Sequence, residues 1–82
     1  MANRSVSEAY DELGLKFELI GALVAYRIEK GITQKQLAEL IGTQQSSIAR
    51  FESGSYNPSL AFAQKIADAI GIKIVVVERE AR

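Results

Sequence analysis

Apolar residues recur along most of the chain at three- and four-residue steps, the spacing of helices that bury one face. Residues 1–14 form an N-terminal extension in which we expect a lead-in helix, broken or bent at Gly14. The following helix should run from residue 15 to Lys30, with Gly31 in the left-handed conformation that often follows a helix. Its inward residues are expected to be Leu19, Ile20, Leu23, Val24 and Ile28.

Two short helices come next, joined by a very tight turn. Thr33 and Gln36 match a capping box at the start of the first helix, and Thr43 is expected to cap the second, which ends at Ser53 and Gly54. Because only two residues separate the helices, they must cross steeply, and Gly42 can supply a positive φ in the turn. The residues expected to face inward are Leu37, Ala38, Leu40, Ile41, Ile48 and Phe51.

The last part of the chain holds one more helix and a segment of different character. After a loop at Ser55–Pro58, Ser59 can cap a fourth helix that ends at Gly71, with Leu60, Ala63, Ile66, Ala67 and Ile70 inward. Ile72–Val77 is β-branched apart from one lysine, which favours a strand. The sequence therefore predicts an all-α fold: a compact bundle of four to five helices over residues 15–71, with one strand in the C-terminal segment 72–82.

A single strand leaves a row of backbone N–H and C=O groups without partners. Since the chain has no second convincing strand, we expect this one to pair with the same strand of a second copy in a two-fold homodimer. The alternatives are a frayed tail, or pairing with a different partner. The residues assigned to dimerisation are Ile72, Ile74, Val75, Val76 and Val77.

Composition excludes several kinds of chemistry. The chain has no cysteine or histidine, so it lacks thiolate nucleophiles, disulfides, the usual general base and the commonest metal ligands. We therefore expect no enzyme, no metal and no cofactor, and no small-molecule site is evident. No apolar run approaches the roughly 20 residues of a membrane span, so a cytoplasmic protein that does not contact membranes is expected.

Charge is balanced overall but not along the chain. Ten basic and ten acidic residues give a formal net charge of zero, which by itself does not point to nucleic acid. Between residues 27 and 50, however, basic residues outnumber acidic ones, so the middle of the chain can present a modestly positive face.

The outer surface of the second short helix suits double-stranded DNA. Glutamine can pair with adenine, and arginine with guanine, in the major groove. This surface carries Gln44, Gln45, Ser46 and Arg50, which we expect to contact bases. Residues placed for phosphate, at the start of the preceding helix and in the loop after the motif, are Gln34, Lys35, Ser55, Tyr56 and Asn57. Lys35 could equally serve solubility alone.

The run G-I-T-Q-K-Q-L-A-E-L-I-G-T-Q-Q-S-S-I-A-R-F-E-S-G, followed by N-P-S-L, resembles the lambda-repressor and Cro-like (XRE-type) helix-turn-helix family over residues 19–71. The resemblance implies that Gln34 clamps a phosphate and that the surface from Gln44 to Arg50 faces the groove. It also implies that Arg27 and Glu52 form an ion pair beneath the motif, with a direct DNA contact as the alternative for Arg27.

The lead-in Y-D-E-L-G-L-K-F-E-L-I and the terminal strand resemble antitoxins of type II toxin–antitoxin pairs. Such proteins repress their own operon and bind a toxin. The function predicted from the sequence is therefore a repressor that binds a palindromic operator as a dimer, and the antitoxin resemblance adds a toxin as a further expected partner. The alternative is a protein-interaction module with weak or no DNA binding.

Overall fold

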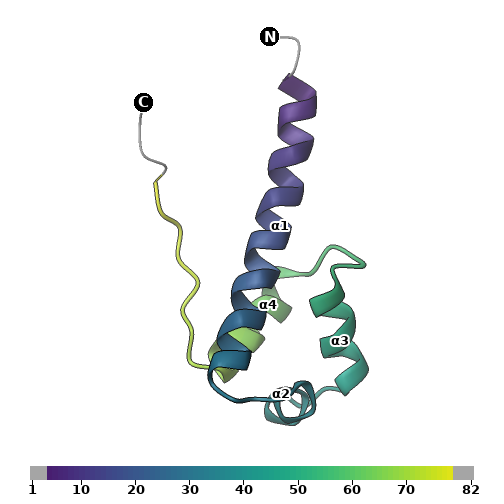
Figure 1. The fold of residues 1–82 in the computed structure, drawn as a ribbon, viewed down its shortest axis with the longest axis vertical. Coiled ribbons are helices and arrows are strands. Elements are labelled where there is room, and N and C mark those ends of the chain that lie inside the picture. Colours follow the sequence, from purple (N-terminus) through teal and green to yellow (C-terminus); the bar gives the residue numbers. More distant parts are fainter. Residues whose placement is uncertain (1–3, 79–82) are drawn as a thin grey trace.

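The computed structural model describes the backbone of residues 4–78 and the side chains of residues 14–78, and this part of the chain folds into four helices (Figure 1). They are α1 (Arg4–Glu29), α2 (Gln34–Ile41), α3 (Gln45–Ser53) and α4 (Leu60–Ala69). The all-α prediction is confirmed. The break expected at Gly14 does not occur, because α1 continues through it; an interior glycine costs only about 1 kcal/mol, which a long helix tolerates.

Local hydrogen bonds define both ends of α2. The Thr33 hydroxyl accepts a hydrogen bond from the Gln36 backbone N–H at 3.0 Å, and the Gln36 side chain accepts one from the Thr33 backbone N–H at 2.8 Å, which confirms the capping box. Gly42 ends the helix at φ 74°. The cap predicted at Thr43 is wrong: its N–H donates to Ala38 at 2.9 Å, so Thr43 closes α2, and the N-cap of α3 is Gln44.

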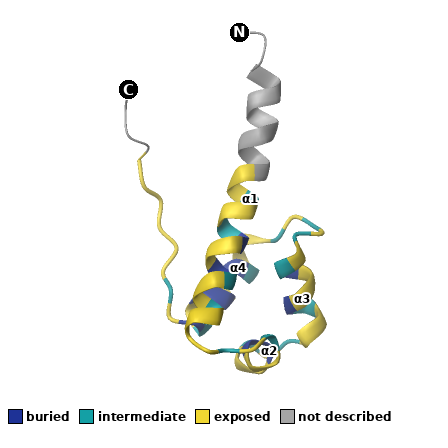
Figure 2. Cartoon of the chain, in the orientation of Figure 1, coloured by how far each residue is buried: buried dark blue, intermediate teal, exposed yellow. Residues whose placement is uncertain are grey.

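The core is apolar and draws on all four helices (Figure 2). Phe51 of α3 meets Phe62 of α4 edge to face, with ring centroids 5.7 Å apart, a favoured arrangement for aromatic pairs. Among the residues with described side chains, the buried ones are Ile20, Leu23, Leu37, Ala38, Ile48, Phe51, Ala63, Ile66, Ala67 and Ile70. Most of the inward residues predicted from the sequence are in this set or pack against it.

Three predicted core residues are instead 60–80% exposed: Ile28, Leu40 and Leu60. Ile28 and Leu60 lie in terminal turns of α1 and α4, where the neighbouring helices no longer cover them. Leu40 falls to one side of the buried face of α2, because successive residues of a helix are about 100° apart. Apolar periodicity therefore located the core but overestimated its extent at the helix ends.

The C-terminal segment is extended, but no strand forms within residues 4–78, so the prediction of a strand is not borne out. The Ile72 backbone N–H donates to the Ala67 carbonyl at 2.8 Å and anchors the start of the segment against α4. Beyond it the chain runs beside α1 (Figure 1) without a strand to pair with in the described chain. A groove lies between the two, lined by residues from Leu15 to Tyr26 of α1 and by residues 72–77.

Candidate nucleic-acid interface

The turn at Gly42 sets α3 across α2 and directs one face of α3 to solvent. Ile48 and Phe51, which point inward, are fully buried and fix the helix in place. The four residues predicted to contact bases are all exposed: Gln44, Gln45, Ser46 and Arg50. Ser46 and Arg50 are four residues apart and therefore share one face of the helix. The structure thus presents the predicted contact residues together on one accessible surface.

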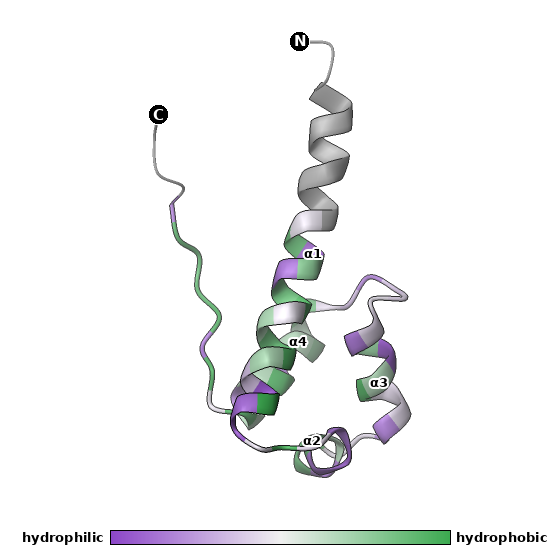
Figure 3. Cartoon of the chain, viewed as in Figure 1, coloured by the Kyte–Doolittle hydropathy of each residue, from purple (hydrophilic) through white to green (hydrophobic). Residues whose placement is uncertain are grey.

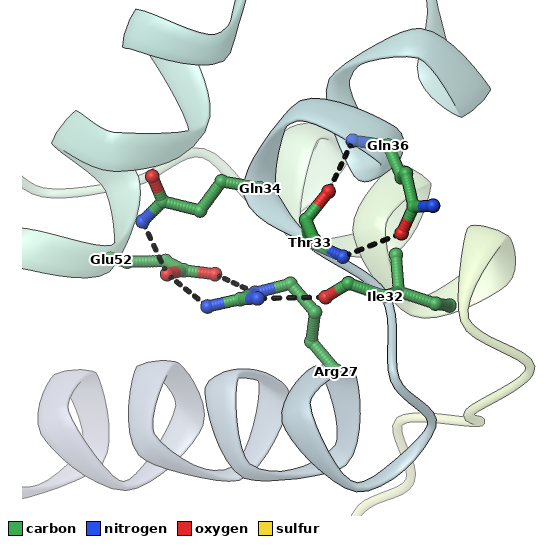
Figure 4. Close-up of polar contacts among 6 residues, drawn as sticks. All are labelled: Arg27, Ile32, Thr33, Gln34, Gln36 and Glu52. Carbon is green, nitrogen blue, oxygen red and sulfur yellow. Dashed lines mark hydrogen bonds and ion pairs between the residues drawn. The ribbon is translucent and has the colours of Figure 1, made fainter.

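An ion pair lies behind this surface and joins α1 to α3 (Figure 4). The Arg27 guanidinium donates through Nε to Glu52 Oε2 at 2.6 Å and through Nη2 to Oε1 at 2.9 Å. Its third arm, Nη1, donates to the Ile32 carbonyl at 2.8 Å, at the approach to α2. Both side chains are only 11% exposed. A planar guanidinium suits such two-point contact with a carboxylate, so this pair ties three parts of the motif together.

Gln34, the first residue of α2, completes the same network. Its side-chain N–H donates to Glu52 Oε1 at 2.9 Å, so the carboxylate accepts three hydrogen bonds in all (Figure 4). Glu52 is the only acidic residue of α3, and its charge is balanced within the fold. The amide NH2 group of Gln34 has a second N–H, which leaves a donor for a phosphate. Lys35 beside it is exposed.

The loop after α3 carries a second set of predicted residues at the C-terminal end of this helix, the end away from α2 (Figure 1). Ser55 and Asn57 are exposed and Tyr56 is half-buried. Gly54 turns the chain at φ 72°, and a Cβ there would lie 3.0 Å from the Phe17 ring, so a larger residue would meet both backbone strain and crowding. The Arg50 guanidinium lies over the Tyr56 ring, 5.2 Å from its centroid.

The residues assigned to dimerisation lie apart from this surface, on the C-terminal segment. Ile72 is half-buried against the core, whereas Ile74, Val75, Val76 and Val77 are exposed, and Val76 is fully so. Figure 3 shows this segment as a largely hydrophobic stretch.

Two contacts were not foreseen from the sequence. The hydrogen bond from Gln34 to Glu52 joins residues 18 positions apart, and no local pattern signals it. The contact between Arg50 and Tyr56 had a visible signal: the two residues are six positions apart, on either side of a glycine that closes a helix. Such a turn can fold an aromatic residue back over the last turn of the helix.

A steeply crossed pair of short helices with a solvent-facing second helix defines a helix-turn-helix protein, and comparisons with known proteins agree. A family model described as helix-turn-helix matches residues 23–77. An uncharacterized HTH-type transcriptional regulator of Haemophilus influenzae is 39% identical over 70 residues, which cover 85% of this chain and 71% of the regulator. The immunity repressor protein of Bacillus phage phi105 is 39% identical over 56 residues, 68% of this chain and 39% of the repressor.

Among solved structures, a chain from a structure titled "Toxin-Antitoxin module from Streptococcus pneumoniae" is similar with a TM-score of 0.70 and 36% identity. The match covers 89% of this chain and 80% of the other. The chain belongs to the helix-turn-helix family, and the resemblance identified from the sequence is confirmed. Membership of this family of transcriptional regulators also supports the prediction that the protein is not an enzyme. None of the helices within residues 4–78 has the length and hydropathy needed to cross a bilayer.

Proposed function

We propose that this protein is a sequence-specific DNA-binding transcriptional repressor that reads the major groove with α3. The observation that carries the proposal is the exposed face of α3, with Gln44, Gln45, Ser46 and Arg50 outward and its one acid neutralised behind it. Residues at the N-terminal end of a recognition helix contact base edges in this motif. The similarity to a phage immunity repressor supports repression as the outcome of binding.

The flanking residues would hold the DNA backbone on either side of this helix. Gln34 and Lys35 begin α2, where free backbone N–H groups and the helix dipole favour an anion. Ser55 and Asn57 follow α3, are exposed, and would reach phosphates from the opposite side. Contacts to phosphate position a protein on the duplex, whereas contacts to base edges provide sequence specificity.

The repressor would act as a homodimer, formed through the C-terminal segment and α1. The groove between them is lined mostly by apolar side chains, with two charged residues of opposite sign, Glu18 of α1 and Lys73 of the segment. In a two-fold dimer a surface meets its own copy, so Glu18 of one chain can face Lys73 of the other. Two recognition helices about 34 Å apart would then match a near-palindromic operator.

Selection of bound sequences from random DNA, followed by gel-shift titration of the most enriched sequence, tests the proposal. We expect enrichment of a near-palindrome and binding at least about 1,000-fold tighter than to unrelated DNA, the lower end for specific DNA-binding proteins. No enrichment, with equal affinity for all duplexes, would contradict it and would favour a protein-interaction module.

Arg50→Ala should weaken binding to the selected operator by about 1–3 kcal/mol, because one side chain that can pair with guanine is lost. The preference at one base pair of each half-site should disappear as well. Gel-shift titrations against operators substituted at each position measure both effects. A variant with the wild-type affinity and preference would remove Arg50 from base readout.

Lys35→Ala should instead weaken binding to every sequence alike. A lysine that contacts phosphate releases a counterion on binding, so the slope of log K against log salt should fall by about 1 in magnitude. Titrations at several salt concentrations measure this slope. Lys65→Ala is the matched control, since Lys65 is an exposed lysine of α4 beside the hollow between α2 and α4; an equal change of slope in both variants would contradict a specific contact by Lys35.

A role as an antitoxin is the second candidate function, favoured by the structural similarity to a chain of a toxin–antitoxin module. A repressor and an antitoxin are compatible roles, because a toxin that binds away from α3 leaves the DNA-binding face of this helix free. Co-expression with the product of the adjacent gene, followed by size-exclusion chromatography, tests it. Separate elution of the two proteins would contradict this second role and leave the first intact.

A further inference from the structure

We propose that Tyr56 is a positioning residue for base readout: its ring holds the Arg50 guanidinium in place for the groove before DNA arrives. The proposal rests on the proposed function, since it concerns how the α3 face achieves specificity. It assigns Tyr56 a task different from the phosphate contact predicted from the sequence.

The geometry of the loop fixes where the ring lies. The Ser53 hydroxyl donates to the Arg50 carbonyl at 2.8 Å and accepts a hydrogen bond from the Ser55 N–H at 3.3 Å, so one side chain ties the helix end to the loop. Gly54, at φ 72° against Phe17, then ends α3 and turns the chain into the loop. As a result Tyr56 reaches the side chain of Arg50, six residues earlier, at 5.2 Å from ring centroid to guanidinium carbon.

The chemistry of this contact leaves the arginine able to read a base. A guanidinium within about 6 Å of an aromatic centroid is attracted to the ring. Stacking uses the flat face of the guanidinium, while the N–H donors that pair with guanine O6 and N7 lie along its edge. A free arginine side chain loses considerable rotamer freedom when it is ordered on binding. Holding Arg50 on Tyr56 in the free protein removes part of that cost.

The test compares Tyr56→Leu, which removes the ring, with Tyr56→Phe, which keeps it and removes the hydroxyl. Tyr56→Leu should weaken operator binding by about 2- to 5-fold, the factor that corresponds to an exposed cation–π contact. Tyr56→Leu should reduce the sequence preference at the same base pair at which Arg50→Ala abolishes it. Tyr56→Phe should bind like the wild type, and Tyr56→Leu should have no further effect in the Arg50→Ala background.

NMR of the free protein gives a readout that does not depend on DNA. The methylene resonances of Arg50 should be shifted upfield by the ring in the wild type and in Tyr56→Phe, and should return to ordinary values in Tyr56→Leu. If the wild type bound no DNA selectively while these shifts were present, the proposed function would fail and the contact itself would stand.

Two results would overturn the positioning role. If Tyr56→Phe and Tyr56→Leu weakened binding to all sequences equally, the hydroxyl would be a phosphate contact. If Tyr56→Leu kept the wild-type affinity and base preference, the ring would have no part in readout. Thermal melts of each variant, with binding measured well below the transition, separate either result from partial unfolding.

Discussion

Glu52→Ala is expected to lower the free energy of unfolding by about 3 kcal/mol, the low end of the cost of leaving one member of a buried ion pair without its partner, because this pair is partly buried. The substitution removes the acceptor of both Arg27 contacts and of the Gln34 amide, and strands a guanidinium that is only 11% exposed. Urea denaturation followed by circular dichroism measures the change. A loss this large is a substantial part of the stability of any small domain.

Two further variants show whether the cost comes from the unpaired charge. Arg27→Met combined with Glu52→Leu should recover part of the loss, because no charge then remains buried. Glu39→Ala, at an exposed acid of α2, should change stability by less than about 0.5 kcal/mol. If Glu52→Ala matched Glu39→Ala, the pair would be irrelevant to stability.

Val76→Asp combined with Val77→Asp is expected to convert the proposed dimer to monomers and to reduce operator affinity by about 100-fold or more, since two linked binding modules gain that much over one. Both valines are largely exposed in the single chain, at 100% and 79%, so the fold should not suffer. At a two-fold interface the new carboxylates would meet their own copies. Light scattering coupled to size-exclusion chromatography gives the mass, and gel shifts give the affinity.

Leu60→Asp is the matched control for this pair, because Leu60 is also a highly exposed apolar residue but begins α4, outside the groove. It should remain a dimer with unchanged affinity for the operator. A wild-type protein that elutes as a monomer at concentrations where it saturates the operator would refute the dimer.

Local signals in the sequence were enough for most of the fold. Thr33 with Gln36, and Gly42 and Gly54, mark helix ends through interactions that span only a few residues, and the structure places them as predicted. The burial of Ile48 and Phe51 was predictable from the spacing of apolar residues. The surface of α3 followed from the same spacing, because whatever does not face the core must face solvent.

What the sequence did not reveal depends on longer-range or competing interactions. Thr43 has the side chain of a cap, but its backbone N–H donates to the Ala38 carbonyl, so the residue ends α2 and does not begin α3. Leu40 and Leu60 look like core residues until the positions of the neighbouring helices are known. The Ile72–Val77 segment has the composition of a strand, yet strand structure requires a second strand that the described chain does not contain.

Helices α2 and α3 are only eight and nine residues long, which determines how the DNA-binding face responds to heating. Helices below about 12 residues are marginal in water when isolated, so a peptide cut from this region would be mostly coil. The exposed face of α3 therefore keeps its structure only while the whole core is intact, and it unfolds together with the core. Loss of repression on warming should therefore follow the unfolding transition of the protein.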